Sequence, residues 1–194
     1  MKVLFAIVTS SIVVLLGYYV IFADKSEDKK DAASLNEAMI ATYQDSRGGI
    51  VFDYKTGIEG YVTEERVPVA TDEEPIKTIV LIPSEDATEA PPLGGEASPV
   101  ISVALYTNSE NLSPLAWAEK NPQYSTINQL QGERGDITVA GASAIRYMAD
   151  GLYVSENVVI AHNGMIYVIT GQFIDEQTDI RRDFSPLIES IRFL

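Results

Sequence analysis

Hydrophobic positions along the chain follow three patterns: one uninterrupted apolar run at the start, short β-branched runs through the middle, and one helically spaced stripe near the end. The first run, Val3 to Ala23, holds 21 residues without a charge and is bounded by Lys2 and Asp24. At 1.5 Å per residue it is about 31 Å long, which matches the hydrocarbon core of a bilayer. Tyr18 and Tyr19 lie near its far end, where amphipathic rings favour the membrane interface. The pattern predicts a transmembrane anchor over Val3–Ala23.

Two other interpretations of this run are weaker. A buried core helix rarely extends this far without a polar face. A cleavable signal peptide has an apolar run of about 7 to 15 residues and small residues before its cleavage site. Ile21-Phe22-Ala23 offers a small residue only at its last place. We therefore expect the anchor to remain uncleaved.

Charges near the run give opposing indications of its orientation. Lys2 precedes it, whereas Lys25, Lys29 and Lys30 follow it, so a strict positive-inside count leans against export of the residues that follow. An apolar run that begins at residue 3 is nevertheless typical of an export signal. We expect a single-pass protein of the cell membrane, with its amino terminus inside and its C-terminal domain extracytoplasmic.

The residues after Asp24 are first charged and then amphipathic. The charged stretch is typical of a solvated tether. Ser34 and Glu37 then have capping-box spacing, and apolar residues recur at helical spacing up to Gly48-Gly49. We assign residues 24–48 to a charged tether and a short helix, and 49–194 to one globular domain.

From Ile50 onward the pattern is that of β-structure. The best-defined element is a hairpin around Asn163-Gly164, the preferred pair for a type I′ turn. A loop is predicted from Pro83 to Pro99, where prolines and glycines stand among acidic residues. Runs rich in β-branched residues predict strands at 50–54 and 58–62 around the turn 55–57, and at 76–82, 100–106, 142–148, 152–155, 158–162 and 165–169.

Two helices are predicted after the first strands. Ser113-Pro114 has the serine cap and first-turn proline of a helix start, and Trp117 then falls on the apolar arc as a core anchor. Near the end, Pro186 removes a helix hydrogen bond, so the last helix is expected to kink or to restart with Ser185 as its cap. Its apolar stripe consists of Ile180, Phe184, Leu187, Ile188 and Ile191.

The hairpin strands also indicate the architecture. Residues 158–160 and 166–169 are apolar at successive positions, which is expected when both faces of a sheet are covered. We predict an α+β domain with a mostly antiparallel sheet of five to seven strands covered by helices.

The order of these elements resembles that of the PsbP-like family. The resemblance covers roughly residues 50–194 and is carried by Ser113–Glu119, Ile137–Gly141, Gly164–Ile169 and Ile188–Phe193. These are packing sequences, and the Tyr-Pro pair with which the family opens is absent. The resemblance implies a mostly antiparallel sheet between helices. Photosynthetic members bind a membrane protein complex, but no motif of this chain carries their binding residues, so the resemblance leaves the function open.

Composition excludes several classes of function. The chain has no cysteine, which excludes disulfides, thiol catalysis and cysteine-ligated zinc, and its one histidine cannot build a multi-histidine metal site. The formal net charge is −14, from 14 Lys+Arg and 28 Asp+Glu, which argues against nucleic acid as a partner.

No residue pattern indicates catalysis or a cofactor. His162 lies beside the predicted hairpin turn, where it is expected to face solvent without a catalytic partner. Gly141-Ala142-Ser143-Ala144 lacks the second glycine of a nucleophile elbow. Phosphate loops, dinucleotide fingerprints, zinc-protease motifs and EF-hand spacings do not occur. We assign no catalytic or cofactor-binding residue, and a hydrolase that uses paired carboxylates stays open as an alternative.

Acidic residues concentrate between positions 64 and 96. A solvated surface explains such a cluster, and two functional alternatives are weak binding of calcium or magnesium and contact with a basic partner. Metal binding here is left open. The nine carboxylates, set against Arg66 and Lys77, belong to Glu64, Glu65, Asp72, Glu73, Glu74, Glu85, Asp86, Glu89 and Glu96.

These exclusions favour a protein without enzymatic activity. We expect a membrane-anchored, extracytoplasmic module that interacts with an unidentified protein or envelope partner. The alternatives are the carboxylate-dependent hydrolase and an acidic accessory domain that binds divalent cations.

Overall fold

The computed structural model describes residues 39–68, 75–88 and 98–194. These residues belong to one compact unit, Ala38–Leu194. The predicted anchor Val3–Ala23 and the predicted tether lie outside the described residues. Within the described ranges, no helix has the length and apolar character that a membrane span requires. The compact unit begins about ten residues before residue 49, where the sequence placed the start of the globular domain.

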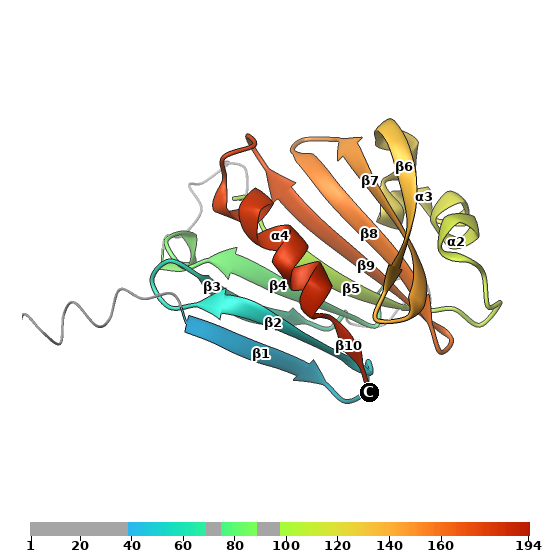
Figure 1. The fold of residues 1–194 in the computed structure, drawn as a ribbon, viewed down its shortest axis with the longest axis horizontal. Coiled ribbons are helices and arrows are strands. Elements are labelled where there is room, and N and C mark those ends of the chain that lie inside the picture. Colours follow the sequence, from blue (N-terminus) through green and yellow to red (C-terminus); the bar gives the residue numbers. More distant parts are fainter. Residues whose placement is uncertain (1–38, 69–74, 89–97) are drawn as a thin grey trace, which may run out of the picture. The chain divides into compact units, whose positions relative to one another are not determined.

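The core of the unit is a seven-stranded antiparallel sheet (Figure 1). Its spatial order is β3-β4-β5-β9-β8-β7-β6, and neighbouring strands pair antiparallel throughout. The predicted α+β class and the mostly antiparallel sheet are confirmed. In chain order the strands are β3 (Tyr61–Arg66), β4 (Lys77–Pro83), β5 (Ile101–Thr107), β6 (Leu130–Val139), β7 (Ala142–Asp150), β8 (Val154–His162) and β9 (Met165–Phe173).

Smaller elements cover both faces of this sheet. One face carries α4 (Asp179–Ser190) alongside a three-stranded sheet of β1 (Met39–Asp45), β2 (Ile50–Thr56) and β10 (Arg192–Phe193) (Figure 1). The other face carries α2 (Pro114–Lys120) and the short α3 (Pro122–Ser125). Two 3₁₀ turns, η1 (Asp86–Thr88) and η2 (Ile127–Gln129), lie in the connections.

The hairpin of β8 and β9 forms as predicted and divides the core in two. Asn163 and Gly164 have φ angles of 47° and 74°, the positive values that a type I′ turn requires. Successive side chains then enter opposite layers: Val158 and Ile160 pack towards α4, whereas Val159 packs towards Trp117. The continuous apolar runs are therefore explained by burial on both faces.

The α2 helix also follows its sequence signals. The Ser113 hydroxyl accepts a hydrogen bond from the backbone N–H of Ala116 at 3.2 Å. Trp117 is 5% exposed, and its ring centroid lies 4.9 Å from that of Tyr106. Trp117 is thus the core anchor that its position on the apolar arc predicted.

The last helix keeps the predicted stripe, and the predicted restart at Ser185 does not occur. Ile180, Phe184 and Leu187 are buried, and α4 runs through Pro186 without restarting. Ser185 does not cap a new helix, because its hydroxyl accepts a hydrogen bond from the Arg146 guanidinium at 2.7 Å. Pro186 lies on the exposed side of α4, where water can hydrate the carbonyl that loses its N–H partner.

The helix predicted before residue 49 is wrong over its described part. Residues 39–45 form β1, which pairs with β2 from Met39 opposite Thr56 to Asp45 opposite Ile50. The Tyr43 ring stacks on Phe52 with centroids 5.0 Å apart. This long-range packing overrides the local helical spacing.

The two strands predicted around residues 55–57 do form, but they do not pair with each other. β2 belongs to the small sheet and β3 to the large one, so the Gly57–Gly60 connection carries the chain between sheets. A Cβ on Gly60 would lie 2.6 Å from the backbone N of Thr56, so only glycine fits this crossing.

Two further strand predictions need correction. The segments predicted as 152–155 and 158–162 are one strand, β8, because the polar residues between them are buried in the sheet. β6 was missed, since most of its side chains are exposed and no apolar run marks it.

Candidate binding cleft

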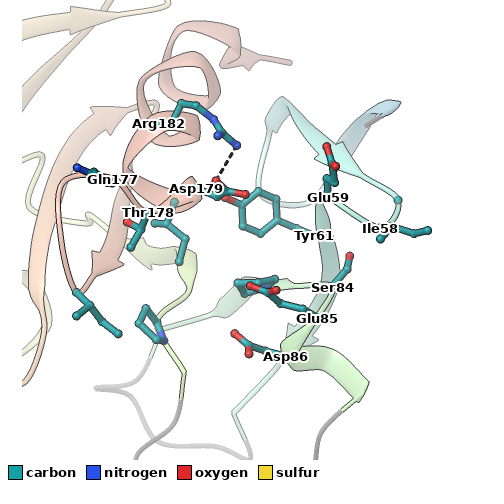
Figure 2. A pocket seen from close by; sticks show the side chains of 16 residues that line it. Ile58, Glu59, Tyr61, Ser84, Glu85, Asp86, Gln177, Thr178, Asp179 and Arg182 are labelled. Atoms are coloured by element: carbon teal, nitrogen blue, oxygen red, sulfur yellow. Dashed lines mark ion pairs between the residues drawn. The ribbon is translucent and has the colours of Figure 1, made fainter. Parts of the chain in front are cut away.

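A cleft with a volume of about 1020 Å³ lies among the described residues (Figure 2). Three segments form most of it: the β2–β3 connection at Gly57–Tyr61, the end of β4 with the turn after it at Pro83–Asp86, and residues 174–182 with the start of α4. The Ser84 N–H donates to the Gly60 carbonyl at 2.9 Å and so holds the first two segments together. The site is therefore built at one end of the large sheet from separate connections.

The cleft walls carry more negative than positive charge. Four carboxylates stand against one guanidinium, that of Arg182. Arg182 lies 2.9 Å from Asp179 (Figure 2). It also lies 3.3 Å from the buried carboxylate of Asp183. Asp179 opens α4, where the helix dipole favours a negative charge. The four carboxylates are those of Glu59, Glu85, Asp86 and Asp179.

Apolar side chains at the cleft are unusually open to solvent. Ile58 is 64% exposed and Ile174 is 70% exposed. They come from two different walls, the β2–β3 connection and the residues that precede α4. Exposed isoleucines around a concave surface are typical of a place where another molecule binds.

Tyr61 connects the cleft with the interior. Its ring lines the cleft (Figure 2), and its hydroxyl donates to Asp183 at 3.3 Å. The Lys55 ammonium lies 2.5 Å from the other oxygen of Asp183. Burial and the negative charge of Asp183 raise the pKa of Tyr61, so the phenol stays protonated as a donor. Tyr61, Lys55 and Asp183 also line a second, smaller cavity of about 210 Å³ between β2 and α4.

Part of the acidic region 64–96 lies in the cleft, and part holds the fold together. Glu85 and Asp86 line the cleft. Glu64 pairs with Arg66, and Glu65 accepts from the Tyr43 hydroxyl at 2.7 Å and lies 3.0 Å from Lys77. The remaining acidic residues, Asp72, Glu73, Glu74, Glu89 and Glu96, lie outside the described residues.

Carboxyl groups with shifted pKa values take part in hydrogen bonds and ion pairs that stabilise the fold. Hydrogen bonds from Tyr43 and Lys77 lower the pKa of Glu65, and a hydrogen bond from Arg66 lowers that of Glu64. Burial alone would raise the pKa of Asp45, but hydrogen bonds with Lys77 and with the backbone N–H groups of Gly48 and Arg47 outweigh it and lower the value. A general acid needs a raised pKa, and none of these groups lines the cleft.

Other chemical candidates are also placed by the structure. His162 is half-buried rather than solvent-facing, because its ring stacks on Phe193 with centroids 4.1 Å apart. Ser143 pairs in register with Ala161, so its side chain points to the opposite face of the sheet from His162. The two cannot form a catalytic pair. The part of the chain that the structure describes also holds no group of three or more acidic or histidine side chains arranged for a metal ion.

Sequence reasoning missed most of the cleft. Ile58 was placed in a strand, and Asp179 and Ile174 received no role. The one local signal was Ile174, an isoleucine followed by the polar residues Asp175-Glu176-Gln177.

The domain has a PsbP-like fold. It is similar to the solution structure of cyanobacterial PsbP (CyanoP) from Synechocystis sp. PCC 6803, with a TM-score of 0.53 and 12% sequence identity. The similarity covers 82% of this chain and 95% of that one. No protein-family profile matches the sequence, and no curated protein matches it significantly. The similarity to the PsbP structure confirms the fold that the resemblance in residues 50–194 implied.

Proposed function

We propose that this domain is a non-enzymatic binding module whose cleft takes up a basic, partly apolar segment of a partner protein. The observation that carries the proposal is the combination of four wall carboxylates with the exposed side chains of Ile58 and Ile174. A partner that supplies lysine or arginine beside an apolar side chain satisfies both features.

The isoleucines and the carboxylates are expected to contribute differently to binding. Full burial of an isoleucine side chain contributes about 1.5 to 3 kcal/mol, so Ile58 and Ile174 can supply most of the affinity. The wall carboxylates act mainly on the association rate and on partner choice, and salt screens them. Affinity should therefore fall modestly with salt and strongly when the isoleucines are truncated.

We further propose that the domain is held at the extracytoplasmic face of the cell membrane by an uncleaved helix over Val3–Ala23. The length of this uncharged run supports the anchor. Protease added to intact cells should digest the domain and leave the anchor in the membrane. Protection of the domain in sealed cells would contradict the orientation, and a mature amino terminus at residue 24 or beyond would contradict the anchor.

The binding proposal can be tested by site-directed crosslinking, because the chain has no cysteine of its own. Ile174→Cys and Ile58→Cys place a photo-crosslinker at the cleft in the full chain within its native membrane. Ile76→Cys is the matched control, since Ile76 is 46% exposed and lies at the opposite end of β4 from Pro83. We expect one reproducible partner at both cleft positions and none at the control.

Charge reversal gives the second arm of this test. Asp86→Lys should weaken the crosslink from position 174, whereas Glu133→Lys on the exposed strand β6 should not. Equal crosslinking at all three cysteine positions would contradict a cleft partner. Turnover of a cell-wall glycan that Asp86→Asn abolishes would replace the proposal with the carboxylate-dependent hydrolase.

A further inference from the structure

The strand β1 ends the small sheet at an open edge. The order of that sheet is β1-β2-β10, and no described strand pairs with the outer side of β1. On the other side of β2, β10 pairs with Ile50 and Val51, and the Asp53 N–H donates to the Ser190 hydroxyl of α4 at 2.9 Å. Among the described residues, the backbone of the small sheet is therefore closed on the α4 side and open along β1.

The other sheet edges in the described residues carry features that discourage pairing with another chain. β3 presents Glu64, Glu65 and Arg66. β6 contains Glu133, Arg134 and Asp136, and its register with β7 shifts between Gln131 and Gly135. β10 is two residues long. Charges, irregular register and short length are the usual protections of edge strands.

β1 has none of these protections. From Met39 to Gln44 it contains no charged residue and no proline, and its pairing with β2 is regular over all seven positions. Met39 is 62% exposed and Ile40 is 68% exposed. The one charge of the strand, at Asp45, is buried and lies 3.0 Å from Lys77.

We propose that β1 pairs with β1 of a second copy of this chain, antiparallel and centred on Thr42, so that the two small sheets join into one. This register is the one that pairs all seven residues, and it sets Ile40 opposite Gln44 and Met39 opposite Asp45.

The distribution of charge allows a second copy to pair at β1 and directs a basic partner elsewhere. Two copies that each carry a net charge of −14 repel over most of their surfaces. They can meet at β1, because Met39–Gln44 brings no carboxylate against its own equivalent. A basic partner would instead be drawn to the acidic cleft, which is formed by other segments. The proposal does not depend on the function assigned to that cleft.

A single pair of seven-residue strands buries little surface. We therefore expect a weak dimer in fast exchange, visible as a mass that rises with protein concentration. The full chain, carrying its own amino-terminal segment, is the form to measure.

The experiment compares matched substitutions on two exposed edges. Thr42 on β1 and Thr138 on β6 are both exposed threonines. Thr42→Lys sets like charges directly opposite each other across the proposed two-fold axis and should abolish the dimer in sedimentation velocity, whereas Thr138→Lys should leave it intact. Thr42 is exposed, so the monomer accommodates a lysine there and loses only the hydrogen bond that the Thr42 hydroxyl donates to Asp53 at 2.7 Å.

Oxidative crosslinking gives an independent readout. In this cysteine-free chain, Thr42→Cys should form a disulfide between two copies, and Thr138→Cys should not. A protein that stays monomeric at all concentrations overturns the proposal. So does a dimer that survives Thr42→Lys, because its contact must then lie elsewhere in the chain.

Discussion

Replacing Gly171 with alanine is expected to lower the free energy of unfolding by about 2 to 3 kcal/mol. Gly171 lies on β9, with Ile101 and Glu156 as its neighbours on the two adjacent strands. A Cβ at this position would lie 2.5 Å from Cδ2 of Phe184. Phe184 is 1% exposed, so its ring has no room to retreat. The missing side chain on β9 is what lets α4 pack closely on the sheet.

Two opposing effects decide the size of this change. Alanine reduces the entropy of the unfolded chain and alone would stabilise the protein by up to about 1 kcal/mol. Overpacking a filled core costs about 1 to 3 kcal/mol, and a contact this short lies at the upper end. The clash therefore prevails.

Urea unfolding followed by the fluorescence of Trp117, the single tryptophan, measures the effect. Gly135→Ala on β6 is the control, since a Cβ there would meet only the Arg146 carbonyl oxygen at 3.8 Å. Combining Gly171→Ala with Phe184→Leu should cost less than the sum of the two single changes, because the smaller side chain relieves the clash. Strict additivity, or equal effects at the two glycines, would contradict this explanation.

Elements whose signals are local could be predicted from the sequence. The turn at Asn163-Gly164 needs positive φ at two adjacent positions, and this residue pair adopts such φ angles with little strain. The start of α2 depends on Ser113 and Pro114 alone. Burial on both faces of the hairpin could be predicted for the same reason, because Val158, Val159 and Ile160 leave no polar face.

Elements decided by distant residues could not be predicted in this way. β1 has helical spacing in its own sequence, but Tyr43 stacks on Phe52 and hydrogen-bonds Glu65, 22 residues further along the chain. Likewise, the residues after Thr56 look like an ordinary hairpin turn. Their actual direction depends on the pairing of β3 with β4, which no local pattern contains.

The cleft shows the same limit more strongly. Its walls come from residues 57–61, 83–86 and 174–182, which only the order of strands in the sheet brings together. The sequence indicated that acids would cluster between 64 and 96, yet only Glu85 and Asp86 of the described members reach the cleft. Glu59 and Asp179 come from outside that range. A count of charges along the chain cannot distinguish these positions.

Removing the buried carboxylate of Glu156 is expected to destabilise the protein by about 3 kcal/mol. Glu156 is 5% exposed on β8 and pairs with Arg146 of β7 and Arg181 of α4. Arg146 also donates to Ser185 at 2.7 Å, and the Arg181 guanidinium lies 5.2 Å from the centre of the Phe173 ring. One carboxylate thus joins two strands to the helix that covers them.

Glu156→Ala leaves both guanidinium groups without their shared acceptor. Loss of one partner of a buried pair costs about 3 to 5 kcal/mol. Because Arg146 and Arg181 keep 33% and 28% of their side-chain surface exposed, water can hydrate them and offset part of that loss. The lower end of the range is therefore expected. Glu156→Gln keeps the shape and one acceptor oxygen, so it should cost clearly less than the alanine substitution.

The matched comparison is Glu110→Ala, which breaks the exposed pair between Glu110 and Lys120. Their side chains are 60% and 54% exposed, and such pairs contribute little to stability. The same urea titration should place Glu110→Ala within error of the parent protein, in low and in high salt. If Glu156→Ala were equally harmless, packing and the remaining contacts of Arg146 with Ser185 and of Arg181 with Glu176 would be enough to hold the two arginines. The attachment of α4 to β7 and β8 would then depend on the contact of Phe184 with Gly171 and on the apolar stripe of α4, with no contribution from the charge of Glu156.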